Sequence, residues 1–224
     1  MPTNYPKAIL FDWDNTLVDT WGCICDATNA ALRYMGRPEW SLDETKLRVA
    51  ASLRDSFPGL FGDRWQEARD VFYASFKANH LKSLAPLPGA QAMLEHLSGQ
   101  GIYLGVVSNK TGDLLRLEAD HLGWTGYFGR LVGASDAEAD KPSDAPLRLA
   151  LKGTGIAPGP EVWMVGDTGV DLECAGRAGC LPILLRESPP MDGEFTPYHP
   201  VRHINGCAQL TTLVQESLVP ISRI

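Results

Sequence analysis

Residues 8–16 read Ala-Ile-Leu-Phe-Asp-Trp-Asp-Asn-Thr, an apolar run that ends abruptly at two aspartates, Asp12 and Asp14. Four consecutive apolar residues predict a strand buried on both faces, as in a parallel sheet. Ligands bind beyond the carboxyl ends of such strands, so both aspartates are expected in a site. Side chains two apart on an extended backbone point the same way, roughly 6–7 Å apart. One carboxylate could attack phosphorus while the other serves the leaving group, although both could also be turn or capping residues.

Further apolar runs predict a parallel sheet around this first strand. Helical patterns lie between most of the runs, and Leu114, Leu115, Glu118 and Leu122 make up one of these helices. Strand–helix alternation of this kind predicts a doubly wound, Rossmann-like α/β core. The five expected strands are residues 8–11, 102–107, 130–132, 162–165 and 181–185.

The stretch between the first two strands has a different pattern. It contains no convincing strand and predicts three or four helices, most clearly at 23–35, 42–53 and 64–78. Ser41 with Glu44 forms a capping box, and Asp63 with Gln66 repeats that pattern before the next helix. A block of about 65 residues is much longer than a simple crossover needs. The sequence therefore predicts a helical domain, residues 20–85, inserted into an α/β core made of residues 1–19 and 86–224.

Composition narrows the possible classes of protein. The 224 residues are 44% hydrophobic, which is enough for a buried core, and the formal net charge is -7. No basic stripe is present, so a nucleic-acid polymer or a membrane surface is a disfavoured partner. No apolar run has the length of a membrane helix or a signal peptide. The five cysteines match no zinc pattern and are interpreted as reduced thiols, which favours a cytoplasmic protein.

Polar residues also follow the later strands. The Ser108 hydroxyl, with nearby backbone N–H groups, suits phosphate oxygens. The Lys141 ammonium could neutralise phosphate charge and keep a nucleophilic carboxylate ionised. Asp167 and Asp171 suit a hard cation with oxygen ligands, although Asp171 could merely cap the helix that follows. Each of these features alone is a weak signal.

Their order along the chain carries more information. The segment Asp-Trp-Asp-Asn-Thr at 12–16 resembles the first signature of the haloacid dehalogenase superfamily, Asp-x-Asp-x-Thr. The three later signatures of the family are matched in order, so the resemblance spans nearly the whole chain. They are Val-Val-Ser-Asn-Lys at 106–110, Asp-Lys-Pro at 140–142 and Gly-Asp-Thr-Gly-Val-Asp at 166–171.

The resemblance implies a phosphoric monoester hydrolase with a helical cap, as in phosphoglycolate-phosphatase-like enzymes. Its substrate would be a small phosphate monoester, such as phosphoglycolate, a sugar phosphate or a nucleotide. Asp12 would form an aspartyl-phosphate, and Asp14 would act as acid and then base. The Thr16 hydroxyl would orient Asp14.

The resemblance also implies a magnesium ion. Its ligands would be Asp12, the main-chain carbonyl of Asp14, and Asp167, with Asp171 as a ligand or as a partner that orients one. Ser108, the Asn109 backbone and Lys141 would cradle the transferring group. In the cap, Arg54 could meet an anionic leaving group, as could Lys46 and Arg48, although a solvated helix face is the more common role of such residues.

Carbon–halogen dehalogenases and phosphonate-cleaving relatives typically lack the second aspartate, so Asp14 favours phosphate-ester hydrolysis. Two alternatives to such a hydrolase stay open. A sugar phosphomutase shares the aspartyl-phosphate chemistry, but the sugar phosphomutases used for comparison carry a histidine soon after the first signature, and residues 18–21 contain none. A non-catalytic protein that binds Mg²⁺ and phosphoryl ligands is the other alternative. The sequence does not predict the oligomeric state.

Overall fold

The computed structural model of the protein describes residues 5–48 and 53–217, with the side chains of residues 53–56 outside this description. The chain divides into two compact units. The first unit comprises Met1–Val18 and Pro86–Ile224, and it contains the sheet. The second unit, Asp19–Ala85, is helical.

The first unit is built on a parallel sheet. Among the described residues the sheet has six strands in the order β5-β4-β1-β6-β7-β8. The strands are β1 Ala8–Phe11, β4 Tyr103–Thr111, β5 Arg130–Ala134, β6 Val162–Gly166, β7 Leu181–Leu185 and β8 Arg202–Ile204. Strand β1 lies between β4 and β6, and all four of its residues are fully buried. Its apolar run is therefore explained by neighbours on both edges and cover on both faces.

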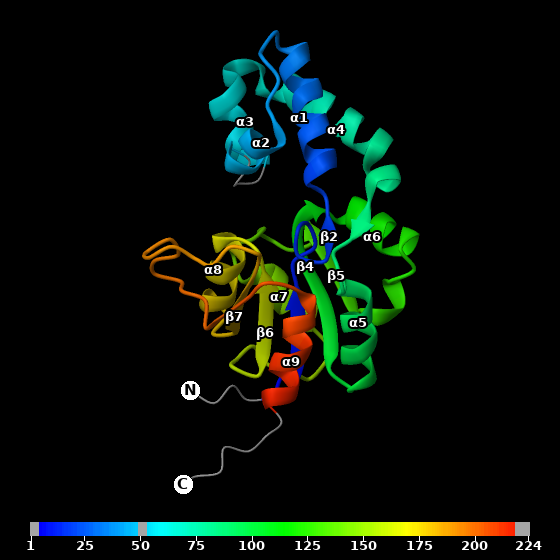
Figure 1. Ribbon diagram of the computed structural model, residues 1–224, viewed down its shortest axis with the longest axis vertical. Helices are drawn as coiled ribbons and strands as arrows, with labels where there is room; N and C mark the ends of the chain where they lie inside the picture. The colour runs from blue at the N-terminus through cyan, green and yellow to red at the C-terminus, as the bar shows by residue number, and fades with distance from the viewer. Residues whose placement is uncertain (1–4, 49–52, 218–224) are drawn as a thin grey trace. The chain divides into compact units, whose positions relative to one another are not determined.

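Helices cover both faces of this sheet. On one face, Leu10 and Met164 of the sheet pack with Leu147 of α7 and Ala175 of α8. Helices α5 and α9 contact each other, and Figure 1 shows α9 in front of the sheet and α7 behind it. The predicted doubly wound α/β fold is confirmed. The helices of this unit are α5 Ala90–Gly99, α6 Gly112–His121, the 3₁₀ helix η2 Thr125–Tyr127, α7 Ala145–Leu151, α8 Gly169–Arg177 and α9 Cys207–Ser217.

The second unit has a core of aromatic side chains. Phe57 lies 5.7 Å from Phe72 between ring centroids, and Phe72 stacks on Phe76 at 5.8 Å. Where the chain passes between the units, β2 Val18–Asp19 pairs with β3 Ala85–Pro86. The helices are α1 Trp21–Tyr34, α2 Leu42–Arg48, α3 Leu53–Phe61, the 3₁₀ helix η1 Gly62–Arg64 and α4 Trp65–Ser83.

Some local predictions are confirmed and others are wrong. Ser41 and Glu44 do form a capping box, with N···O distances of 2.9 and 3.1 Å. The Asp63–Gln66 box is wrong, because η1 occupies that stretch and α4 starts at Trp65 with no side-chain cap. Residues 49–52 of the expected helix 42–53 lie outside the described residues, and α3 and β8 were not expected. No helix in the described part of the chain combines the length and apolarity needed to span a membrane.

Candidate active site

The carboxyl ends of the central strands bring the predicted residues together. Phe11 pairs with Val106 of β4 on one side and with Val165 of β6 on the other. The next residue along, Asp12, donates its backbone N–H to the carbonyl of Val165 at 2.8 Å. Because β6 ends at Gly166, the side chain of Asp167 follows at the same edge of the sheet. The parallel register therefore places the first and fourth signatures side by side.

An acidic cluster forms at this edge. One carboxylate oxygen from each of Asp12, Asp167 and Asp171 lies within 4.8 Å of the other two. The Lys141 ammonium bridges two of these groups, at 2.7 Å from Asp12 Oδ1 and 2.6 Å from Asp171 Oδ1. Three carboxylates against one ammonium leave an excess of negative charge, and oxygen donors are the ligands that Mg²⁺ prefers. The donor set therefore fits a magnesium ion.

Burial and mutual repulsion raise the pKa of two acids of the cluster, Asp12 and Asp167. Burial raises the pKa of Asp12 to about 7, and the Asp171 and Asp14 carboxylates add to this rise while Lys141 opposes it. Burial, with the charges of Asp12 and Asp171, also raises the pKa of Asp167 well above its usual range. Burial alone would lower the pKa of Lys141, but the Asp12 and Asp171 carboxylates raise it above its ordinary value. Lys141 therefore stays charged, whereas Asp12 and Asp167 hold protons more tightly than usual.

Asp171 has a structural role as well as a place in the cluster. Its Oδ2 accepts hydrogen bonds from the backbone N–H of Thr168 at 3.1 Å and from the Thr168 hydroxyl at 2.8 Å. The first of these bonds is part of the capping box at the start of α8. A β-carbon at Gly166 would overlap the Asp171 side chain, so only glycine allows this approach. The two interpretations of Asp171, helix cap and member of an acidic site, are compatible.

The Thr16 hydroxyl has a different partner from the one expected. It donates to Asp167 Oδ1 at 3.4 Å, whereas the resemblance implied that it orients Asp14. Thr16 is fully buried in the turn after β1, where Asn15 adopts a positive φ of 61°. Asparagine tolerates this left-handed conformation better than most residues. Thr16 therefore contacts the acidic cluster rather than the second aspartate.

Ser108 and Asn109 lie near the end of β4, which is longer than predicted and includes both residues. Ser108 is buried, and its Oγ accepts the backbone N–H of Lys110 at 3.1 Å. The Asn109 amide donates to the Lys141 carbonyl at 2.9 Å and accepts the Lys141 backbone N–H at 3.0 Å. The Asn109 side chain thus fixes the loop that presents Lys141, a role that the sequence did not indicate.

A second buried charge cluster surrounds Asp14, and sequence reasoning missed it. The Lys110 ammonium lies 2.8 Å from Asp14 Oδ1 and 2.6 Å from Glu118 Oε2. The Trp13 indole N–H donates to the same Glu118 oxygen at 2.7 Å. A charged residue among Leu114, Leu115 and Leu122 was the available signal, because an acid on an apolar helix face needs a buried partner.

Three positively charged residues of the helical unit were expected near a leaving group, and the structure describes the side chains of two of them. Arg54 lies in α3, but its side chain is outside the described residues. The Arg48 guanidinium lies 4.8 Å from the Trp40 ring centroid and 3.4 Å from Glu44. The Lys46 ammonium lies 6.0 Å from the ring centroid of Trp21. Arg48 and Lys46 therefore contact partners inside the helical unit.

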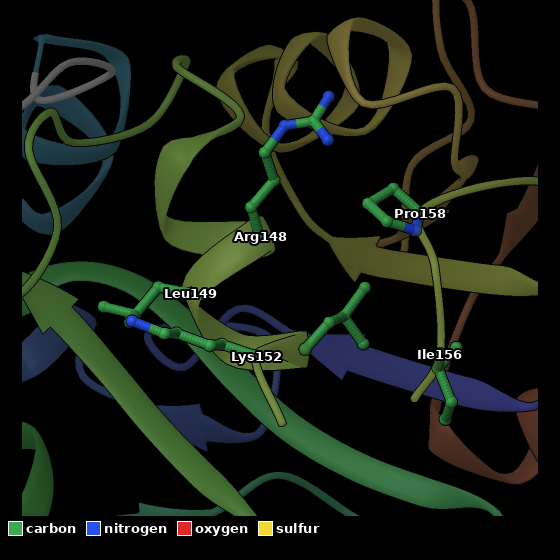
Figure 2. Close-up of a pocket in the computed structure, with 6 residues that line it drawn as sticks. Arg148, Leu149, Lys152, Ile156 and Pro158 are labelled. Atoms are coloured by element: carbon green, nitrogen blue, oxygen red, sulfur yellow. The ribbon is translucent and has the colours of Figure 1, made fainter. Parts of the chain in front are cut away.

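A surface hollow of about 340 Å³ lies elsewhere in the first unit, on α7 and the segment after it. It includes no residue of the acidic cluster. Figure 2 shows that Arg148 and Lys152 extend in different directions rather than toward a common point. The hollow therefore lacks the converging polar groups of a catalytic site. Its lining residues are Arg148, Leu149, Leu151, Lys152, Ile156 and Pro158.

Comparisons with known proteins point to one family. Residues 9–184 match the model of the haloacid dehalogenase-like hydrolases. A phosphoglycolate phosphatase of Aquifex aeolicus is 32% identical over 174 residues, which cover 77% of this chain and 81% of that protein. Among solved structures, a hydrolase of the same superfamily from Ehrlichia chaffeensis is 28% identical, with a TM-score of 0.66 over 96% of this chain and 99% of that one. A haloacid dehalogenase-like hydrolase from Streptococcus pneumoniae shares the fold at 23% identity, with a TM-score of 0.82 over 95% and 99% of the two chains.

Proposed function

The chain belongs to the haloacid dehalogenase-like hydrolases, and we propose that it is a Mg²⁺-dependent phosphatase acting on small phosphate monoesters through an aspartyl-phosphate. One observation carries the proposal. Oxygens of Asp12, Asp167 and Asp171 lie within 4.8 Å of one another, and Lys141 bridges two of these residues. Such a site can place a carboxylate nucleophile, a divalent cation and a fixed ammonium around one phosphoryl group.

In the first step, an oxygen of Asp12 attacks the phosphorus atom of the monoester. The bond between phosphorus and the ester oxygen breaks as the new Asp12–phosphorus bond forms. Asp14 donates a proton to the departing alkoxide, so the product leaves as an alcohol. Lys141 offsets the charge of the transferring group, and its loop is held by Asn109.

In the second step, water hydrolyses the aspartyl-phosphate. Asp14, now ionised, takes a proton from the attacking water, and the Asp12–phosphoryl bond breaks. Inorganic phosphate leaves, and Asp12 returns as a free carboxylate. The Ser108 hydroxyl and the Asn109 backbone, near the end of β4, would contact the phosphoryl oxygens.

Asp12, Asp167 and the main-chain carbonyl of Asp14 would hold the magnesium ion, with Asp171 as a ligand or as an orienting partner. The ion would supply positive charge to offset the repulsion between these carboxylates and a dianionic phosphate. Thr16, which donates to Asp167, would keep that ligand in one orientation.

The names of the relatives support a substrate class. Several of them, including the Aquifex aeolicus protein, are named phosphoglycolate phosphatase. We therefore expect a small phosphate monoester as the substrate, such as phosphoglycolate, a sugar phosphate or a nucleotide, with the helical unit acting as a cap that selects the leaving group. The five free cysteines are typical of a reducing compartment and support a cytoplasmic location.

A substrate panel tests the proposal. Purified protein with Mg²⁺ is offered phosphoglycolate, sugar phosphates and nucleoside monophosphates, and the release of inorganic phosphate is measured. We expect Mg²⁺-dependent release from at least one small monoester. Transfer of the phosphoryl group to a second sugar position, with no inorganic phosphate, would identify a phosphomutase instead. Binding without either reaction would identify a binding protein.

Asp14→Asn tests the assigned acid and base. The variant keeps the size of the side chain but cannot donate or accept the required proton, so we expect turnover to fall about 10²- to 10⁴-fold. Stabilisation by Mg²⁺, read from the melting temperature, should persist. Asp113→Asn is the matched control, because Asp113 has a 95% exposed side chain on α6 and should leave the rate unchanged. Equal rates for Asp14→Asn and the wild type would mean that the role given to Asp14 is wrong.

A further inference from the structure

The two aspartates of the first signature bind two different lysines. Asp12 pairs with Lys141 at 2.7 Å, and Asp14 pairs with Lys110 at 2.8 Å. Lys141 contacts the acidic cluster that suits a cation, whereas Lys110 extends from β4 to a carboxylate outside that cluster, Glu118 of α6. The site therefore contains a second cation with its own counter-ion, and no step of the reaction described above uses it.

This second ion pair lies in the interior of the protein. The Lys110 side chain is 4% exposed and the Glu118 side chain is fully buried. Both Glu118 oxygens accept hydrogen bonds from the Lys110 ammonium, at 2.8 and 2.6 Å. Burying such a pair removes two charges from water and contributes little to stability compared with apolar residues of similar size. We therefore expect the Lys110–Glu118 pair, which lies beside the catalytic Asp14, to have a role other than stability.

The same pair also holds the residue between the two aspartates. Trp13 is fully buried, and its indole N–H donates to Glu118 Oε2 at 2.7 Å. Its ring packs edge-on against Trp124, with centroids 5.8 Å apart, and against Phe128 at 6.4 Å. The Lys110–Glu118 pair thus contacts two consecutive residues of the loop, Trp13 through Glu118 and Asp14 through Lys110.

We propose that Lys110 and Glu118 are positioning residues that fix the orientation of the Asp14 carboxylate for proton transfer. Lys110 forms an ion pair with one Asp14 oxygen at 2.8 Å, and Glu118 holds Lys110 in place while anchoring the adjacent Trp13. A carboxyl group constrained in this way needs little reorientation as the departing alkoxide takes its proton. The inference rests on the proposed function, because the purpose assigned to the Lys110–Glu118 pair depends on the acid–base role of Asp14.

The test removes both charges of the pair at once. The double variant Lys110→Met/Glu118→Gln leaves no unpaired charge at these two positions, and the introduced amide oxygen can still accept the Trp13 N–H. Glu118→Gln alone is the milder second variant. Lys7→Met/Glu161→Gln is the matched control, because it removes an exposed ion pair with an N···O distance of 2.6 Å. This pair lies at the amino ends of β1 and β6, whereas the site lies at their carboxyl ends. Failure of both test variants to fold would assign the pair to folding and would overturn the inference.

The kinetic readout separates positioning from general damage. We expect kcat for an alkyl phosphate to fall about 10- to 100-fold in the double variant, with KM and Mg²⁺ affinity close to wild type. With 4-nitrophenyl phosphate, the rate at which 4-nitrophenolate forms in the first turnover should fall less, because this leaving group needs no proton. Equal losses with both substrates, accompanied by weaker Mg²⁺ binding, would indicate a loosened site and contradict the inference. The control variant should match the wild type with both substrates.

A structural readout decides the inference without activity. Crystal structures of the wild type and the double variant should show Asp14 in one orientation in the former, and rotated or in several conformers in the latter. The Asp12–Lys141 contact should be preserved in both. An Asp14 side chain that stays in place in the double variant would overturn the inference. If the wild type hydrolyses no monoester, the proposed function fails, and this comparison still decides whether the pair positions Asp14.

Discussion

The buried Asp12 and the half-buried Asp167 control how the site responds to protons and metal. Burial raises the pKa of Asp12 to about 7, and the pKa of Asp167 is also raised. The folded, metal-free protein therefore retains protons that the unfolded chain releases at lower pH. Because the folded pKa is the higher one, the stabilisation is complete below the unfolded pKa, near 4, and is lost as the pH rises toward 7. We expect the melting temperature of the metal-free protein to fall over this window.

Magnesium should reverse this trend, because a ligating carboxylate must first lose its proton. We expect little Mg²⁺-dependent stabilisation at pH 5 and a clear increase in melting temperature at pH 8. At a Mg²⁺ concentration of about 100 times its Kd, binding should increase the free energy of unfolding by about 2.7 kcal/mol. Differential scanning fluorimetry with and without chelator, at matched ionic strength, measures both effects. Asp167→Asn should weaken the response at pH 8, and stabilisation that does not depend on pH would contradict the assigned ligands.

At the scale of elements, the contact between β6 and α8 determines where Asp171 lies. The alanine side chain of Gly166→Ala would overlap the Asp171 carboxyl, so α8 must shift away from the strand. We expect a loss of about 1–3 kcal/mol in the free energy of unfolding, as for other overpacked sites. Stabilisation by Mg²⁺ should weaken at the same time, because Asp171 belongs to the acidic cluster. Urea unfolding with and without Mg²⁺ measures both.

Gly159→Ala is the control for this variant. Gly159 precedes the same strand, and a β-carbon there would meet no atom within 4 Å. Its stability and its response to Mg²⁺ should therefore match those of the wild type. If Gly166→Ala also matches the wild type, the packing of α8 against β6 does not set the position of Asp171.

Strands and helices could be predicted from the sequence where burial alone determines their bounds. Strands β1 and β7 have the expected bounds, because an apolar run buried on both faces contrasts with the polar residues around it. Strand β8 has only one buried residue among its three, and α3 contains Pro58, a residue that usually ends a helix. Neither therefore gave a signal. In the site, motifs revealed Asp12 and Lys141, but the partner of Asp14 depends on how α6 packs against β4, which no local pattern encodes.

At the scale of the whole molecule, the helical unit is an insertion between two strands of the sheet. The chain leaves the first unit through β2 and returns through β3, and these two short strands pair with each other. Their pairing brings the two ends of the insertion close together, about 5 Å apart across the strands. The first unit can therefore be closed by a short connection at this point. The predicted site residues of the first unit all remain after such a deletion.

We expect a shortened chain, in which a short Gly/Ser linker replaces residues 20–84, to fold cooperatively and to be stabilised by Mg²⁺ at pH 8. The physical reason is that the sheet, the covering helices and the acidic cluster all belong to the first unit. Discrimination among phosphate monoesters should be reduced if the helical unit selects the leaving group. Circular dichroism melting with and without Mg²⁺ tests the first expectation, and the substrate panel tests the second. Introducing Asp167→Asn into the shortened chain should weaken the Mg²⁺ response, and an unfolded shortened chain would show that the α/β unit depends on its insertion.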